Sequence, residues 1–250
     1  MLNPVVYMTS VQVAAEQEVL WNEFYDEWVD VFTREVPGTV RGSRWQVYDG
    51  RLAGQDPLPS SSRPMYLAFE EYRRVDEFIL SRSWRKQEHW EHRVNSFGPW
   101  FKHLSDYATL NLQGIGPGSY AKELGRHLLC RIWTIPPEQL EAFEQWRLET
   151  IVPMISRGAP GATEQRYVAL LAQLHRHGGA PGELVIPQRH HFEDGGRLCY
   201  VDLYELPGDD VAPEFLDELQ SATDSWGELV ADRQDVLARR LLLVERDGVE

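Results

Sequence analysis

The amino-acid sequence predicts an α+β fold in which a β-α-β-β-α-β unit occurs twice in one chain of 250 residues. Short apolar segments rich in Val, Tyr and Thr are typical of strands, and longer segments with apolar residues three or four apart are typical of helices. Short motifs recur about 122 positions apart, beginning with VAAEQ at 13–17 and IPPEQ at 135–139. We therefore expect a first unit at 1–116, a linker at 117–125 and a second unit at 126–250.

The first unit opens with a strand and a long helix. Residues 5–13 alternate in part and are rich in Val and Thr, which predicts a strand. Residues 15–34 carry one broad apolar face at helical spacing, and Pro37-Gly38 ends this helix. A second strand is expected at 44–49, followed by an irregular loop at 50–64 that is rich in Gly, Pro and Ser.

The rest of the first unit repeats the alternation of strand and helix. We expect a strand at 65–72, a helix at 75–104 and a strand at 107–113. Proline disfavours helix at the residue before it, so the helix is expected to break near Gly98-Pro99. The resulting order is that of the ferredoxin-like split βαβ unit.

The second half follows the same order. Its expected elements are a strand at 127–135, a helix at 137–157, a strand at 165–175, a segment at 184–192 after a glycine-rich turn, a strand at 198–206, a helix at 213–232 and a strand at 236–246.

Individual residues place the two halves in register. The matching positions are Trp21 with Phe143, Phe24 with Trp146 and Arg44-Trp45 with Arg166-Tyr167, all 122 apart, and Pro37-Gly38 with Pro160-Gly161, 123 apart. An agreement of element order, turn residues and specific side chains favours duplication over a chance likeness of two βαβ segments.

Composition limits the possible partners. A formal charge of −14 disfavours binding to nucleic acid, and no run of Lys or Arg compensates for it. No segment reaches the length of a membrane span, and nothing resembles a leader sequence, so we expect a cytoplasmic protein without a membrane partner. Cys130 and Cys199 lie in apolar strand-like segments, which favours buried free thiols.

The segments FYDEWVDVFTREVPGTVRGSRWQV and FEQWRLETIVPMISRGAPGATEQRYV resemble the dimeric α/β-barrel superfamily, in particular its EthD-like and antibiotic-biosynthesis monooxygenase-like members. The resemblance implies that two antiparallel sheets pack into a barrel, here within one chain. It also implies a ligand cavity between a sheet and its own helices, suited to a small aromatic or polycyclic molecule. Such relatives carry a helix histidine. This chain has Trp28 or Val29 there in the first copy and Thr150 or Ile151 in the second.

Another base is therefore needed if the chain is an enzyme. His103 lies near Asp106 and Tyr107, and a His–Asp pair would suit a general base. The alternative is a histidine that interacts with the dipole at a helix end.

Two further histidine pairs are candidates for metal or haem binding. His190 and His191 lie in a strand-like segment with their side chains on opposite faces, so one of the two could enter the cavity or bind haem iron, and His191 is the catalytic candidate. The GxxDG signature of haem peroxidase relatives is not matched. His89 and His92 could share a helix face, but no third ligand has a recognised spacing, so a solvated helix is favoured and no metal is expected.

Arg44 and Arg166 open equivalent strands. Each could polarise a carbonyl or phenolate, or could form a salt bridge to a helix acid such as Asp26 or Glu149.

Aromatic residues supply the expected substrate contacts. These are Trp21, Phe24, Tyr25, Trp28, Tyr72, Trp100, Tyr107, Trp146, Tyr167 and Tyr204. Polar residues at the ends of the third strand of each copy either line a cavity or mark an exposed edge; they are Glu70, Glu71, Tyr72, Asp202, Tyr204 and Glu205.

Phosphate-binding and dinucleotide-binding glycine motifs and a serine nucleophile elbow are absent from the sequence, so no cofactor is expected. The leading hypothesis is a cofactor-independent oxygenase, cyclase or lyase that acts on an aromatic or polyketide-like substrate in an apolar cavity. The alternatives are a non-catalytic ligand-binding or assembly module of the same fold and a haem-binding barrel. A homo-oligomer is possible in each case.

Overall fold

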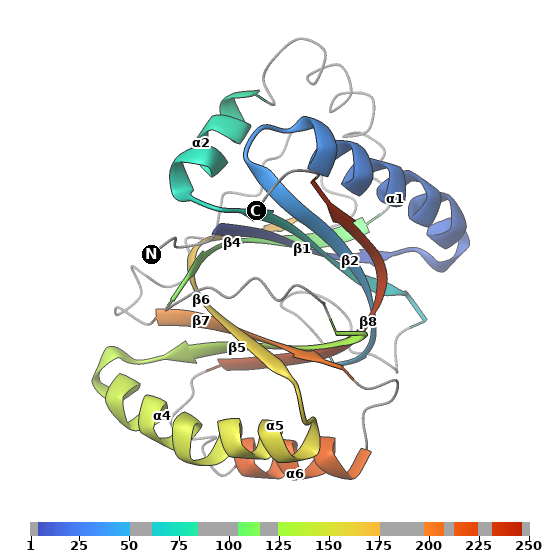
Figure 1. Ribbon diagram of the computed structural model, residues 1–250. Helices are drawn as coiled ribbons and strands as arrows, with labels where there is room; N and C mark the ends of the chain where they lie inside the picture. Colours follow the sequence, from blue (N-terminus) through green and yellow to red (C-terminus); the bar gives the residue numbers. More distant parts are fainter. Residues whose placement is uncertain are drawn as a thin grey trace.

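The chain folds into a closed eight-stranded antiparallel barrel with helices on two opposite sides, as seen in a computed structural model (Figure 1). The structure describes residues 5–50, 62–84, 105–115, 125–175, 198–207, 213–224 and 232–246. Its strands are β1 Val5–Val13, β2 Thr39–Gly50, β3 Met65–Tyr72, β4 Ser105–Gly114, β5 His127–Ile135, β6 Thr163–His175, β7 Leu198–Leu206 and β8 Asp232–Glu245. The predicted α+β class and the barrel are confirmed.

The described helices form an outer layer on each side of the barrel. They are α1 Glu18–Glu35, α2 Val75–Trp84, α4 Leu140–Trp146, α5 Val152–Gly158 and α6 Pro213–Asp224, with short 3₁₀ turns at Ala15–Gln17 and Pro137–Gln139 and a π-helical segment at Arg147–Ile151. Figure 1 shows α1 and α2 over the sheet of the first half and α4, α5 and α6 over the sheet of the second half.

Strand order and register are the same in both halves. The barrel order β1-β3-β2-β8-β5-β7-β6-β4 contains β4-β1-β3-β2 from the first half and β8-β5-β7-β6 from the second. Val6 lies opposite Glu71 across β1 and β3, just as Leu128 lies opposite Glu205 across β5 and β7. Positions 122 apart in β1 and β5, or 134 apart in β3 and β7, are therefore structurally equivalent.

Two local irregularities explain why the offset between the halves changes from 122 to 123 and back. The π-helical segment Arg147–Ile151 accommodates one extra residue in the first helix of the second half. The bulge between Thr39 and Arg41 adds one residue to β2 of the first half and restores the register. Between the helix and the strand, Gly38 of the first half and Gly161 of the second half occupy equivalent turns, with φ of +85° and +86°.

Most expected elements are present, with different bounds. β2 begins at Thr39 rather than at residue 44, and β8 begins at Asp232 rather than at residue 236. The helix expected at 213–232 is described as α6 as far as Asp224, and residues 225–231 lie outside the described residues. The helix expected at 75–104 is described as far as Trp84. The expected segment at 184–192 and most of the loop at 50–64 and of the linker at 117–125 lie outside the described residues.

The alternation of side chains along each strand creates two kinds of core. Lumen-facing residues such as Trp45, Phe69, Cys130 and Tyr167 form one cluster inside the barrel. Residues on the opposite strand faces pack against the helices, for example Tyr66 against α1 and Leu237 against α5 and α6. No described helix is long and apolar enough to span a membrane.

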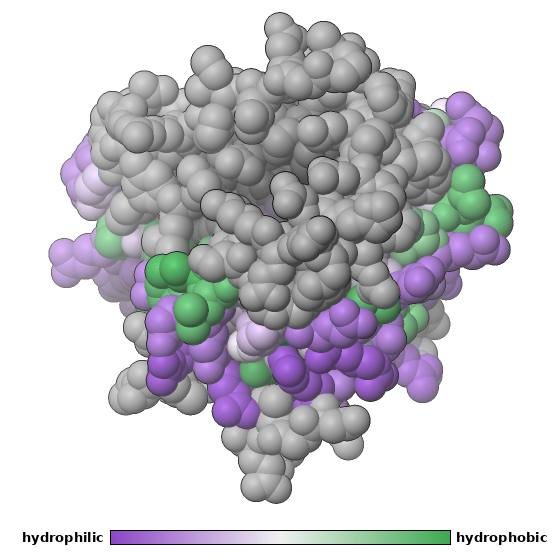
Figure 2. Space-filling view, turned by 90° about the horizontal axis from the view of Figure 1, so that it is seen from above, coloured by the Kyte–Doolittle hydropathy of each residue, from purple (hydrophilic) through white to green (hydrophobic). Residues whose placement is uncertain are grey.

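Among the described residues visible on the side of α1 and α2, hydrophilic side chains predominate (Figure 2). In Figure 2, which looks at this side, apolar side chains lie in small patches separated by hydrophilic ones wherever the residues are described. Exposed apolar side chains of these two helices are Val19, Leu20, Val75, Ile79 and Leu80.

Candidate functional site

A cavity lies in the lumen of the barrel, between the two sheets. The residues that line it form five equivalent pairs, one member from each half: Val6 and Leu128, Ser43 and Gln165, Trp45 and Tyr167, Phe69 and Leu203, Glu71 and Glu205. Its space of about 10 Å³ is enough for about one water molecule. This cavity, as the described residues line it, is therefore too small for the aromatic ligand expected from the sequence.

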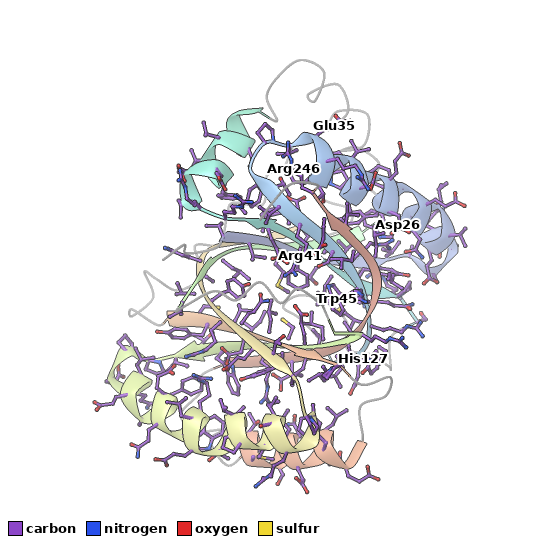
Figure 3. The ribbon with its side chains drawn as sticks, in the orientation of Figure 1. Asp26, Glu35, Arg41, Trp45, His127 and Arg246 are labelled. Carbon is purple, nitrogen blue, oxygen red and sulfur yellow. The ribbon has the colours of Figure 1, made fainter. Side chains whose placement is uncertain are left out.

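Two buried carboxylates, Glu71 and Glu205, line this cavity and have different hydrogen-bond partners. Arg41 donates hydrogen bonds from Nε and Nη2 to the two oxygens of Glu71, at 2.8 and 2.9 Å. Figure 3 shows Arg41 and Trp45 reaching from their strand into the space between the sheets, with Asp26 outside on α1. Glu205 accepts a hydrogen bond from the backbone N–H of Gly125 at 3.1 Å.

Burial raises the pKa of Glu205 to about 7. The charge of Arg41 and the N–H of Gly125 partly offset this effect, whereas the negative charge of Glu71 adds to it. Glu205 therefore exchanges its proton near neutral pH.

A second acidic site lies outside the lumen, between the first sheet and α1. Glu70 is 7% exposed and lies on the helix-facing side of β3, where the hydroxyl of Tyr72 donates to it at 3.5 Å. Tyr25 of α1 is buried, its side chain forms a hydrogen bond with Thr9, and its pKa is raised by burial and further by the charge of Glu70. Tyr7 lies opposite Glu70 in the register of β1 and β3. We call this group the Glu70 cluster: Tyr7, Thr9, Tyr25, Glu70 and Tyr72.

Aromatic side chains border the Glu70 cluster. Trp28 and Phe78 are partly buried and pack against the same hydrophobic cluster as Tyr7 and Tyr72. The rings of Tyr72 and Phe78 meet edge to face at 5.2 Å, which is a favourable aromatic geometry. The combination gives a buried acid and three phenols beside an aromatic surface.

Arg44 is fully buried beneath α1 and is held there by protein groups. It forms an ion pair with Asp26 and donates to the backbone carbonyl of Asn22 at 3.2 Å. Its guanidinium also lies over the ring of Tyr66, at 4.8 Å from the centroid. Of the two roles expected for Arg44, the salt bridge to Asp26 is the one that its described contacts supply.

The equivalent layer of the second half is occupied by ion pairs. Arg166 donates to Asp202 at 2.7 Å and to both oxygens of Glu144, at 2.7 and 2.8 Å, rather than to Glu149. Trp133 donates from its indole nitrogen to the other oxygen of Asp202 at 2.9 Å. The polar side chains of this layer therefore bond to one another within the fold.

The counterparts of the Glu70 cluster show how the halves differ. Tyr204 stands at the position of Glu70, and its hydroxyl donates to Glu164, which is paired with Arg147. Arg131 stands at the position of Thr9 and pairs with Asp235. The first half therefore keeps a buried carboxylate among phenols where the second half has internal ion pairs.

The other residues predicted to contact a substrate lie in different parts of the fold. Trp21 and Tyr25 stack at 4.9 Å beneath α1, whereas Trp146 packs against Trp133 and Phe143 in the second half. Phe24 contacts Trp21, Tyr25 and Trp28. Tyr167 lies in the lumen rather than beside a helix.

Several candidates are outside what the structure describes. Trp100, His103 and His191 lie outside the described residues, and the side chains of Asp106 and Tyr107 in β4 are not described. The backbone register places Asp106 opposite Gln12 and Asn111 opposite Tyr7. Asp106 is thus five residues along the strand from the level of Glu70, about 17 Å away.

Sequence reasoning missed Arg41, Ser43 and Gln165. The signal for them was alternation: in β2, residues 41, 43, 45 and 47 share the lumen face, so a charged residue at 41 stands in line with the buried Trp45 and Val47. The predicted strand began at residue 44 and left Arg41 out of the pattern.

The described residues do not form a metal or haem site. They contain no group of three or more His, Cys, Asp or Glu side chains arranged to hold a metal ion. His127 is the histidine whose side chain is described; it is buried, and its Nδ1 lies 3.4 Å from the hydroxyl of Tyr48. The cavity in the lumen has no room for a planar macrocycle.

Comparison with known proteins supports the fold. No protein-family model matches the chain, and no curated protein sequence is significantly similar to it. The solved structures similar to it include an anthrone oxidase-like protein (13% identity, TM-score 0.58, 99% of this chain and 95% of the other). A putative monooxygenase from Fusobacterium nucleatum (9% identity, TM-score 0.56) covers 99% and 97%, and a putative chlorite dismutase (12% identity, TM-score 0.53) covers 96% and 95%. The similarity spans nearly the full length of both chains in each comparison.

Proposed function

We propose that the chain is a small-molecule enzyme of the oxygenase type, with its active site at the Glu70 cluster between the first sheet and α1. The observation that carries the proposal is the buried Glu70 carboxylate among Tyr7, Tyr25 and Tyr72. A desolvated carboxylate is a stronger base than one in water, and phenol hydroxyls can stabilise oxyanion charge that develops on a substrate.

The names of similar structures support this chemistry. They refer to monooxygenases and to an anthrone oxidase-like protein. In the proposed reaction Glu70 takes a proton from an aromatic or polyketide-like substrate, and the carbanion or phenolate that results reacts with dioxygen without a cofactor. Cyclase or lyase chemistry would use the same proton transfer.

Other parts of the proposal concern the origin and setting of the protein. The equivalent registers of the halves support an internal duplication of a ferredoxin-like unit, with the EthD-like proteins as the proposed relatives. After duplication the second half would have become a scaffold. A secondary-metabolic role, a cytoplasmic location and a homo-oligomeric assembly belong to the same proposal.

The test is a screen of planar hydroxylated aromatics, anthrone among them, for thermal stabilisation and for oxygen consumption. We expect at least one compound to raise the melting temperature and to be consumed with dioxygen, because a ligand that favours the native state stabilises it. Stabilisation without turnover would favour a binding module instead. A Soret absorption band in the purified protein would favour a haem-binding barrel.

A further inference from the structure

The lumen holds two carboxylates at equivalent positions and one arginine between them. Glu71 and Glu205 are both less than 8% exposed and line the same cavity. Arg41 lies opposite Glu71 in the register of β2 and β3 and binds it with two hydrogen bonds. The residue opposite Glu205 in the register of β6 and β7 is Thr163, which carries no charge.

Several groups of the surrounding elements act on Glu205. Arg41 and Glu71 come from the first half, Arg240 comes from β8, and the N–H of Gly125 precedes β5. The β6 residues on the lumen side, Gln165 and Tyr167, are uncharged and bond to each other. Since Arg41 is already engaged by Glu71, ionisation of Glu205 would place a second negative charge beside a cavity that holds about one water molecule.

We propose that Glu205 is a proton-binding site in the seam between the two halves, and that loss of its proton opposes closure of the barrel. When Glu205 is protonated, the positive charge of Arg41 and the negative charge of Glu71 balance each other beside the cavity. An ionised Glu205 adds a buried charge that faces Glu71 across the cavity from the other half.

The direction of the pH dependence follows from the two states. The pKa of Glu205 is about 7 in the folded chain because of burial, against about 4.5 for an exposed glutamate. The folded state therefore binds the proton more tightly, and the stabilisation is complete below about pH 4.5. It declines as the pH rises toward 7 and changes no further above that.

The test compares the melting temperatures of wild type and Glu205→Gln between pH 5 and pH 8.5. Glutamine keeps the size of the side chain and stays neutral. We expect nearly equal melting temperatures at pH 5 and an advantage of about 5 °C for the variant at pH 8. The matched control is Glu138→Gln, an exposed carboxylate before α4, which should show no such pH-dependent difference.

A second variant reverses the effect by supplying the missing partner. Thr163→Arg gives Glu205 the arginine that Glu71 has, so the titration of Glu205, followed by ¹³C NMR of its carboxyl carbon, should move to lower pH. The NMR titration of the wild type also decides the question if Glu205→Gln fails to fold. A Glu205 carboxyl that titrates below pH 5 in the wild type would overturn the proposal, as would a stability difference that does not depend on pH.

Discussion

Arg41 binds Glu71 through two hydrogen bonds inside the barrel, although both residues belong to strands whose lumen faces are otherwise largely apolar. The pair joins β2 to β3 within the first half, and both side chains are almost fully buried. A buried ion pair of this geometry contributes little net stability compared with an apolar pair, but the loss of one partner leaves an uncompensated charge.

Arg41→Met should therefore destabilise the fold strongly. We expect a loss of about 3–5 kcal/mol in the free energy of unfolding, measured by urea denaturation. Removing both charges in Arg41→Met with Glu71→Leu should recover most of the loss. The exposed pair Arg34–Asp30 offers a control, because Arg34→Met should cost less than about 1 kcal/mol. A similar cost for both single variants would contradict the account of the lumen.

Arg166 should matter for stability and not for catalysis. Its guanidinium is engaged by Asp202 and Glu144, which leaves no described contact for a substrate. Arg166→Met should lower the free energy of unfolding by about 3 kcal/mol, because Asp202 is then left buried with the Trp133 indole as its one remaining donor among the described side chains. Turnover of any substrate found in the screen should stay within about twofold of wild type when it is measured below the melting temperature. A loss of activity without a loss of stability would indicate that Arg166 is catalytic and would contradict this prediction.

Gly42 sets the distance between α1 and β2. A β-carbon added there would lie 2.1 Å from Oγ1 of Thr33 and 2.9 Å from Cγ1 of Val29, so even alanine must displace these side chains or the helix that carries them. Gly42→Ala should cost about 1–3 kcal/mol in unfolding experiments. Combining it with Thr33→Ala should recover part of the loss, since the nearest clashing atom is then removed. An unchanged stability in Gly42→Ala would show that the helix sits farther from the strand.

Cys130 should be unreactive in the folded protein. Its thiol is completely buried in the lumen, and burial raises its pKa, so the thiolate that reacts with disulfide reagents is scarce. The variant Cys199→Ser, in which Cys130 is the remaining cysteine, should not react with Ellman's reagent until urea unfolds it. Rapid labelling under native conditions would contradict a closed barrel.

The fold was largely predictable because its signals are local and repeated. Alternation, helical spacing and the Pro-Gly turns are encoded in short stretches. Both glycines of these turns have a positive φ, a conformation that glycine adopts readily. The ends of helices and strands were less predictable. The bulge near Val40 and the π-helical segment at 147–151 each come from a single extra residue, which no local sequence pattern indicates.

The site was less predictable because it depends on pairing across strands. The sequence shows that Glu70 and Glu71 are adjacent, but only the register shows that one faces the helices and the other the lumen. The same holds for Tyr167, which the pattern offered as a substrate contact and the barrel places in the lumen. His103 and His191 remain predictions, because they lie outside the described residues.

Glu70 is the proposed base of an oxygen-consuming reaction. The most direct measurement is the rate of dioxygen uptake by Glu70→Gln and by wild type on the substrate that the screen identifies, with Glu23→Gln, an exposed carboxylate of α1, as the control. We expect Glu70→Gln to bind the compound still but to lose activity by a factor of about 10²–10⁴, while the control keeps its activity. Wild-type rates in Glu70→Gln would contradict the claim and place the base elsewhere in the molecule.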